Sequence, residues 1–302
     1  MTYDVIIIGK GPAGLSAALY TTRGKLSTLI IGKDSSLSKA KTIENYCCSE
    51  SISGEDLIAK GVEQAKSFGA SIIDEEVVGI ENKDDIFVVS TNESDYKARS
   101  ILISTGKEKL RIPIKNINKF EGKGVHYCVA CDGFFYSNSK VGLIGYTDYA
   151  IHELRELEAI TQKITLFTNG NELQINNENL KYLKEKNINI NYDPIDSIEG
   201  EKFIEKLVFK NSTKEEIDGL FIAYGSASSV DFARNLGIDI TNNNILVDDD
   251  QKTNIDGIYA AGDCTGVFPQ IAIAVGQGAI AGQEIKNFIN RMPKLRHHIL
   301  YI

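Results

Sequence analysis

Near its N-terminus the chain reads Val5-Ile6-Ile7-Ile8-Gly9-Lys10-Gly11-Pro12-Ala13-Gly14, a β-branched run followed by a glycine-rich turn. Its β-branched residues predict a buried strand, and the turn after them leads into an apolar stretch, Leu15 to Arg23, that predicts a helix. The glycines have the spacing GxGxxG, which lets a pyrophosphate approach the backbone while the start of the helix supplies unpaired amides. The stretch therefore predicts the opening of a dinucleotide-binding βαβ unit.

The residues after this helix complete the unit. A second predicted strand, Ser27 to Ile31, ends just before Asp34, which stands twenty residues after Gly14. A carboxylate at about this distance binds the ribose of a dinucleotide. A tight turn without a ligand is the alternative, and the position of Asp34 weighs against it.

A second unit of the same kind is predicted in the middle of the chain. Residues 140–144 read as a strand, a turn begins at Gly145, residues 149–160 read as a helix, and residues 163–167 read as another strand. The sequence therefore contains two dinucleotide-type units.

The C-terminal third holds a further glycine-rich segment. A predicted strand there ends in Gly262-Asp263, and the last helix reaches about Phe288. If this strand returns to the first unit, the two ends of the chain form one domain into which the middle is inserted. We thus expect an α/β fold with two Rossmann-like domains, the second inserted into the first. The expected domains are residues 1–112 with 228–302, and residues 113–227.

Composition excludes several classes of protein. With 42% hydrophobic and 25% charged residues, the 302-residue chain is globular rather than disordered. Its longest apolar runs have the length of strands, far short of the ~20 residues that a membrane span needs. A net charge of −8 argues against nucleic acid as a partner. The N-terminus shows no secretory signal, so we expect a cytoplasmic protein that does not bind a membrane.

One of the cysteine pairs has a spacing suited to redox chemistry. Cys128 and Cys131 form a CxxC motif, which brings two sulfurs close enough to form a disulfide. A zinc site is one alternative, although with His126 it would still lack a ligand, so we expect no metal. A buried pair without chemistry is the other. Asp132 directly follows the pair, and we expect it to exchange protons with the thiolates, to cap the next helix, or to do both.

The other three cysteines are expected to be packing residues. Cys47 and Cys48 are adjacent, a spacing that rarely forms a bridge, and Cys264 follows Asp263. In a reducing compartment such thiols stay free.

Four motifs together resemble the low-molecular-weight thioredoxin reductases in order and spacing. They are Gly9 to Gly14, Ile43-Glu44-Asn45-Tyr46, Cys128-Val129-Ala130-Cys131-Asp132-Gly133-Phe134-Phe135 and Gly262-Asp263. The resemblance covers nearly the whole chain. It implies a homodimer that contains FAD and reduces thioredoxin, with Cys131 facing the flavin and Cys128 attacking the partner disulfide. It also implies a set of cofactor-binding residues: Gly9, Gly11, Pro12, Ala13, Gly14, Asp34, Asn45, Gly262, Asp263, Gln270, Ile271 and Ala272.

The second unit departs from the relatives that use NADPH. Thr147 stands where their turn has its second glycine, and its Cβ would obstruct a pyrophosphate. Thr168-Asn169-Gly170-Asn171 replaces a His-Arg-Arg segment that holds the 2′-phosphate, so both cationic partners are missing. Pro269 and Gln270 match an Arg-Gln pair near the flavin. These departures argue against NADPH, and a degenerate but working site is the alternative.

Without NADPH the flavin needs another electron donor. The sequence most resembles the ferredoxin-dependent flavin thioredoxin reductases, which implies reduced ferredoxin as donor. Ferredoxins are acidic, so docking on this acidic chain needs a local basic patch. We call the candidate the basic patch: Lys107, Lys109, Arg111, Lys115, Lys119 and Lys123, with Arg291, Lys294 and Arg296 of the tail. An ordinary solvated surface is the alternative for the patch.

The function has two rivals. One is an NADPH-dependent thioredoxin reductase with an atypical nucleotide site, and the other is a flavin redox sensor without turnover. The apolar tail, residues 295–302, is expected to cover the isoalloxazine ring or a dimer partner.

Overall fold

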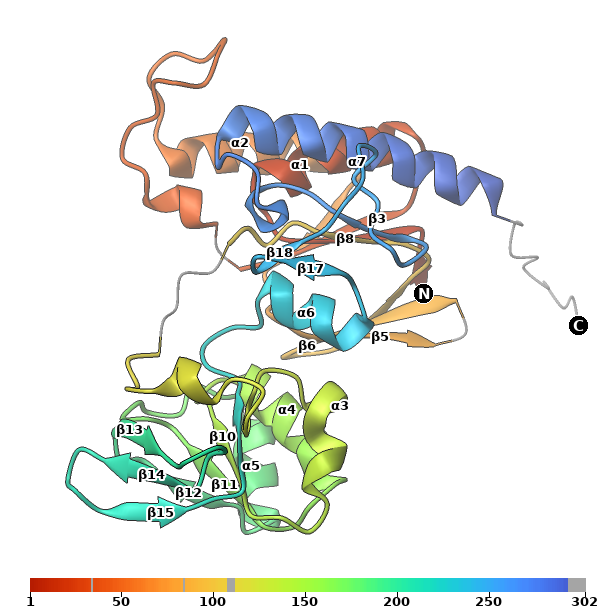
Figure 1. Cartoon of the computed structure of the whole chain (residues 1–302). Helices are drawn as coiled ribbons and strands as arrows, with labels where there is room; N and C mark the ends of the chain where they lie inside the picture. The colour runs from red at the N-terminus through yellow and green to blue at the C-terminus, as the bar shows by residue number, and fades with distance from the viewer. Residues whose placement is uncertain (34, 84, 108–111, 293–302) are drawn as a thin grey trace, which may run out of the picture.

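The computed structural model describes residues 1–33, 35–83, 85–107 and 112–292, and its strands form two parallel five-stranded sheets (Figure 1). The first sheet has the order β19 (Ile258–Ala260), β8 (Ile101–Ile103), β2 (Val5–Ile8), β3 (Thr28–Ile31) and β4 (Ser71–Ile73). The second has the order β12 (Asn189–Asn191), β11 (Ile164–Phe167), β10 (Val141–Ile144), β16 (Gly219–Ile222) and β9 (Val125–His126). The expected α/β class with two Rossmann-like units is confirmed.

We call residues 113–224 the insertion, because they lie between β8 and β19 in the chain and pack around the second sheet, and we call the remainder the outer unit. The outer unit adds a sheet of β1 (Thr2–Tyr3), β7 (Asp95–Ala98), β6 (Ile86–Thr91) and β5 (Val77–Lys83), and a ribbon of β17 (Ile240–Thr241) and β18 (Asn244–Ile245). Its helices are α1 (Pro12–Arg23), α2 (Gly54–Ser67), α6 (Ser229–Leu236) and α7 (Ile271–Arg291). The insertion adds β13 (Ile195–Glu199), β14 (Lys206–Phe209) and β15 (Lys214–Glu216), with helices α3 (Val129–Asp132), α4 (Asp148–Glu158) and α5 (Asn177–Glu185). Short 3-10 turns lie at Ser36–Lys39, Ile117–Phe120, Gly133–Tyr136 and Asp263–Thr265.

The central strands β8, β2 and β3 of the first sheet are buried and, apart from Thr28, apolar, because both faces of the sheet are covered there. Val5 and Ile7 of β2 point toward α1, α2 and α7, whereas Ile6 and Ile8 point toward β5, β6 and α6. All four side chains are at most 2% exposed. The unbroken β-branched run at the N-terminus is therefore the centre of a three-layer arrangement.

Glycines in α7 let it lie directly on α1. A Cβ at Gly278 would come within 2.1 Å of Ala13 O, and a Cβ at Gly282 within 2.6 Å of Ala17 O. The glycines of this segment thus serve helix packing, which holds the C-terminal helix over the first glycine turn.

The insertion contacts the outer unit through a mixed interface. Val78 of β5 belongs to the same hydrophobic cluster as Val129 and Val141 of the insertion, and the His152 ring packs against Gly79. Asn176 Nδ2 donates to Asn92 O at 2.7 Å. The position of α3 and α4 relative to the outer unit is thus defined by contacts with β5 and the turn after β6.

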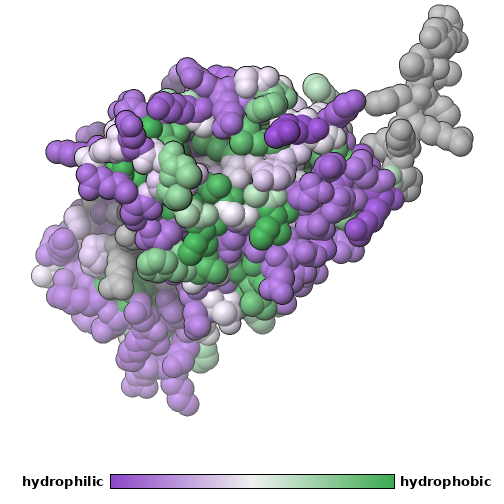
Figure 2. Space-filling model, turned by 90° about the horizontal axis from the view of Figure 1, so that it is seen from above, coloured by the Kyte–Doolittle hydropathy of each residue, from purple (hydrophilic) through white to green (hydrophobic). Residues whose placement is uncertain are grey.

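Viewed from the side of α2 and α7, the surface shows apolar residues between polar flanks (Figure 2). A cavity of about 260 Å³ lies between α1, α2 and α7. Its lining includes Pro12, Tyr46 and Ile271, and Tyr20 and Ile280 of the same helices are exposed. Within the described ranges, no helix has the length and hydropathy needed to cross a membrane.

Candidate active site

The first glycine turn has two positions, Gly9 and Gly14, at which only glycine fits. Gly9 has φ +112°, and a Cβ there would come within 2.4 Å of Ser104 O. A Cβ at Gly14 would come within 2.1 Å of Gly9 O. At Gly11 the space is open, since a Cβ would meet only Ser35 Oγ at 3.6 Å. The backbone of the turn is therefore packed tightly on its inner side and accessible at Gly11.

The start of α1 suits an anion. Gly11 is the N-cap and provides no side-chain acceptor for the first amides, Pro12 occupies the first turn, and no acidic residue lies there. Amide groups at such a helix start carry positive partial charge and bind phosphate.

The second glycine segment meets the first. Gly262 follows β19 with φ +88°, and a Cβ there would lie 3.2 Å from Ala13 Cβ. The side chain of Gln277 in α7 accepts a hydrogen bond from Gly262 N at 2.8 Å and so stabilises this turn. Asp263, the next residue, is half-buried. The two glycine segments, one from each end of the chain, therefore lie against each other.

The remaining expected cofactor contacts lie at the start of α7. Asn45 Nδ2 donates to Gln270 Oε1 at 2.9 Å, and Ile271 and Ala272 form the first turn of the helix. Asp34, the expected ribose acid, lies outside the described residues. The assignment of these residues to a cofactor remains a prediction.

Cys128 and Cys131 form a disulfide with a Cα–Cα distance of 5.3 Å. Cys131 N donates to Cys128 Sγ at 3.0 Å, a bond that would stabilise a thiolate at Cys128 after reduction. Cys128 is 2% exposed, whereas Cys131 is exposed and its sulfur lies 3.5 Å from Arg234 O of α6. In this arrangement Cys131 is the exposed residue of the pair, and the expected attacking residue Cys128 is buried.

Asp132 does not cap the following helical turn, so that expectation was wrong. Its carboxylate contacts His126 instead, with 3.0 Å between Asp132 Oδ2 and His126 Nδ1. The other ring nitrogen of His126 lies 2.7 Å from the hydroxyl of Tyr136. With both ring nitrogens engaged, His126 is not free to complete a metal site with the cysteines.

A buried carboxyl, Glu153 of α4, lies behind the cysteine pair and was missed in the sequence. It is 3% exposed, accepts a hydrogen bond from Val129 N, and lies 3.4 Å from Asn235 Nδ2 of α6. Burial raises its pKa from 4.5 to about 7. The signal was an acidic residue inside the helical apolar stripe of Ala150, Leu154 and Leu157.

The other cysteines differ from one another. Cys47 and Cys48 are exposed, so the expectation that they pack in the core was wrong. Their loop stands outside the sheet core, and the two sulfurs are 3.5 Å apart. Cys264 is buried, as a packing residue should be, and burial raises its pKa to about 12.

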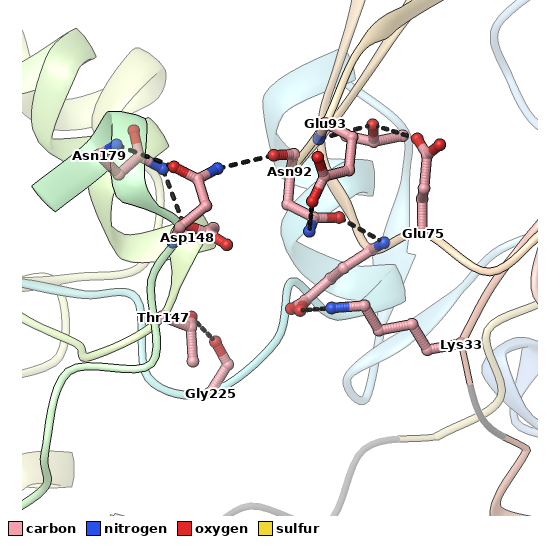
Figure 3. Close-up of polar contacts among 11 residues, drawn as sticks. Lys33, Glu75, Asn92, Glu93, Thr147, Asp148, Asn179 and Gly225 are labelled. Carbon is pink, nitrogen blue, oxygen red and sulfur yellow. Dashed lines mark hydrogen bonds and ion pairs between the residues drawn. The ribbon is translucent and has the colours of Figure 1, made fainter.

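The second turn is closed by contacts within the protein (Figure 3). Thr147 Oγ1 donates to Gly225 O, and Gln174 N donates to Tyr146 O at 2.7 Å. Asp148, which is 8% exposed, places a carboxylate in the first turn of α4. That carboxylate accepts from the Asn176 amide and the Asn179 side chain at 2.9 and 2.8 Å. A phosphate here would meet a carboxylate and a hydroxyl in place of free amides.

The side chains of the segment after β11 also form hydrogen bonds within the protein. Asn169 Oδ1 accepts from Ile195 N at 2.8 Å, and Asn171 Nδ2 donates to Tyr224 OH at 2.9 Å. These amides stabilise a turn at the place where cationic side chains would be needed for a 2′-phosphate.

The chain matches known proteins over nearly its whole length. Residues 3–278 match the family model described as pyridine nucleotide-disulphide oxidoreductase. A thioredoxin reductase of Bacillus subtilis is 31% identical, with 96% of each chain covered. The atypical thioredoxin reductase TRi from Desulfovibrio vulgaris Hildenborough is 40% identical with a TM-score of 0.93, covering 96% of this chain and 99% of that one. A ferredoxin-flavin thioredoxin reductase from Clostridium acetobutylicum is 31% identical with a TM-score of 0.70, covering 96% and 99%. The chain therefore belongs to the pyridine nucleotide-disulphide oxidoreductase family, as a homologue of the thioredoxin reductases.

Proposed function

We propose that the protein passes electrons from FAD to the disulfide of Cys128 and Cys131 and on to the disulfide of thioredoxin, and that its donor is reduced ferredoxin. The observation that carries the choice of donor is the closed turn at Thr147 and Asp148. A nucleotide diphosphate would have to displace these contacts and lie against a buried carboxylate, which costs electrostatic free energy.

The cofactor is FAD, and the residues of the first turn fit it. Gly9, Gly11 and Gly14 leave the amides at the start of α1 open to a pyrophosphate, and Asp263 supplies a half-buried acceptor beside them. Asn45 is held at the start of α7 by Gln270. FAD supplies the step between one-electron and two-electron chemistry, which a ferredoxin donor requires.

The protein residues then govern the thiol chemistry. Cys131 N–H favours a negative charge on Cys128 Sγ, and Asp132 can exchange the protons that accompany disulfide reduction. We propose Asp132 as the acid and base, because it directly follows Cys131 in the chain.

We further propose that the insertion moves during turnover. In Figure 1, α7 lies on one face of the first sheet, whereas α3 lies beside α6 on the other, so the sheet separates the pair from the site formed by Asn45 and Gln270. Among the described residues, the polar contacts that a rotation would break include those of Asn176 with Asn92, of Glu153 with Asn235 and of Arg234 with Cys131 and Tyr127. We place the domain boundaries at 112/113 and 227/228, with residues 1–112 and 228–302 as the FAD-binding domain and 113–227 as the inserted redox domain.

We propose the basic patch as the ferredoxin-binding site, although some of its lysines already contact other residues of the protein. Lys115 pairs with Asp196 at 2.9 Å, and Lys107 donates to Asn244 at 3.0 Å. Lys109, Arg111, Lys294 and Arg296 lie outside the described residues, as do all of residues 293–302. The described part of the patch also includes Lys119, Lys123 and Arg291, the last residue of α7, and Lys119 Nζ donates to Gly200 O at 3.4 Å.

We also propose a homodimer in the cytoplasm. The apolar face of α1, α2 and α7 with its cavity supports self-association. The exposed free thiols of Cys47 and Cys48 suit a reducing compartment.

Anaerobic mixing tests the donor. We expect NADPH to leave the flavin absorbance unchanged, and reduced ferredoxin to bleach it and to sustain reduction of thioredoxin. Prompt bleaching by NADPH would favour the NADPH-dependent alternative. Bleaching by ferredoxin without thioredoxin turnover would favour the redox sensor. Cys128→Ser is expected to retain FAD and lose turnover, which would assign the chemistry to the pair.

Trapping tests the order of the two thiols. If Cys128 attacks the partner, Cys131→Ser forms a stable mixed disulfide with thioredoxin and Cys128→Ser does not. The reverse result would assign attack to Cys131, the exposed residue of the pair.

A further inference from the structure

His126 is a buried residue close to the cysteine pair in the chain. It lies in β9 beside Phe221 of β16, and the two rings stack with a centroid distance of 5.4 Å. Tyr136 meets the same ring edge-on at 5.3 Å. The imidazole is buried between these aromatic rings, so its orientation is fixed by packing.

The contacts of the ring define a chain of hydrogen bonds. An ionised Asp132 can only accept, so His126 Nδ1 carries the proton in their 3.0 Å contact. In a neutral ring Nε2 is then an acceptor, and Tyr136 OH donates to it at 2.7 Å. Burial, with the charges of Asp132 and Asp218, raises the pKa of Tyr136, so the phenol keeps its proton. The chain runs from Tyr136 through His126 to Asp132.

We propose that His126 is a positioning residue for Asp132 and exchanges with it the proton used in each half of thiol–disulfide exchange. This inference rests on the proposed function. It adds His126 to the cysteine pair and Asp132 as a residue that takes part in the thiol chemistry. No other ionisable group is found against His126 among the described contacts: β16 contributes Phe221, and the 3-10 turn contributes Tyr136.

Thiol–disulfide exchange requires a group that can both donate and accept a proton. A thiolate of the pair attacks one sulfur of the partner disulfide, one S–S bond forms as the other breaks, and the leaving thiolate takes a proton from Asp132. The second thiol of the pair then returns a proton to Asp132 as it attacks the mixed disulfide, and the second leaving thiolate of the partner takes that proton. Between these steps Asp132 is ionised, and a protonated or neutral His126 at 3.0 Å stabilises that charge. The pair leaves as a disulfide and the partner leaves as a dithiol, and the negative charge that began on the attacking thiolate ends on Asp132.

Single-turnover exchange measures this role without the electron donor. The pair is reduced with dithiothreitol, desalted anaerobically and mixed with oxidised thioredoxin from pH 5 to 9. His126→Phe keeps an aromatic ring against Phe221 and removes both nitrogens. His126→Asn keeps a donor near the place of Nδ1 but cannot titrate.

The variants separate positioning from proton exchange. For His126→Phe we expect a rate roughly tenfold or more below wild type. For His126→Asn we expect a partly restored rate whose pH profile has lost one ionisation. A double variant with Asp132→Asn should be no slower than Asp132→Asn alone, because His126 acts through that carboxylate. A wild-type rate and profile in His126→Phe, or losses that multiply in the double variant, would overturn the proposal.

Two further measurements, one on tyrosine variants and one with a small disulfide, complete the test. Tyr136→Phe removes only the hydroxyl and should shift the pH profile even if His126→Phe folds poorly. Tyr182→Phe is its matched control, since Tyr182 donates to Glu158 elsewhere on the insertion and should give the wild-type profile. If the wild-type protein reduces a small aromatic disulfide but not thioredoxin, thioredoxin is not its substrate. The role of His126 is then still tested by measuring the rates at which the same variants reduce the small disulfide.

Discussion

Replacing Glu153 by glutamine should remove a pH-dependent loss of stability from the protein. Glu153 is 3% exposed, and burial raises its pKa from 4.5 to about 7. Below pH 4.5 the carboxyl is protonated in both the folded and the unfolded chain, so burial costs no ionisation. As the pH rises toward 7, the unfolded chain ionises and the folded one does not, so stability falls by about 1.4 kcal/mol per pH unit. The loss reaches about 3 kcal/mol and levels off above pH 7.

Glutamine suits the site in its neutral form. Its carbonyl can accept from Val129 N and from Asn235 Nδ2, as the carboxylate does. Its amide can donate to Asn235 Oδ1, which is buried and has no hydrogen-bond partner among the described residues. Glu153→Gln should therefore keep the packing and remove the ionisation.

Urea unfolding at pH 5 and pH 8, with FAD in excess and the disulfide intact, measures the effect. The free energy of unfolding of Glu153→Gln should exceed that of wild type by about 1 kcal/mol or less at pH 5 and by about 3 kcal/mol at pH 8. Glu156→Gln, an exposed change on the same helix, should show no such difference. An equal gain at both pH values would refute the assignment of a raised pKa to Glu153.

Two further results are expected from the site. Gly14→Ala brings a Cβ within 2.1 Å of Gly9 O, so we expect the purified protein to retain FAD at least roughly tenfold less well, measured by the ratio of flavin to protein absorbance. Full flavin content would contradict the tight turn. In the oxidised folded protein an aromatic disulfide reagent should titrate the two exposed thiols, Cys47 and Cys48, promptly. Cys264 should react only after unfolding, because it is buried and its pKa is raised to about 12.

The parts of the fold that depend on neighbouring residues could be predicted from the sequence. The strand of Val5–Ile8, the glycine turn and the helix after it follow from β-branched residues and from glycine at three spaced positions. Helix α5, Asn177–Glu185, was not predicted, because it is mostly polar and its one buried residue, Leu183, gives no apolar period.

The parts of the site that depend on folding could not be predicted. His126 and Asp132 are six residues apart, and their contact requires β9 to end beside α3. Hydrogen bonding within that pair displaced the capping role expected from Asp132 in the sequence alone. The exposure of Cys47 and Cys48 likewise depends on a loop whose path the sequence does not specify.

The pairing of β19 with β8 has a consequence for how the chain is made. Ile258 lies beside Ile101, so the first sheet needs residues that a ribosome adds more than a hundred positions apart. The second sheet is complete once β16 has emerged at Ile222. During synthesis the insertion can therefore fold while the outer unit still waits for its last strand. The chain then closes around a domain that already exists, and a truncation before Ile258 should leave that domain folded.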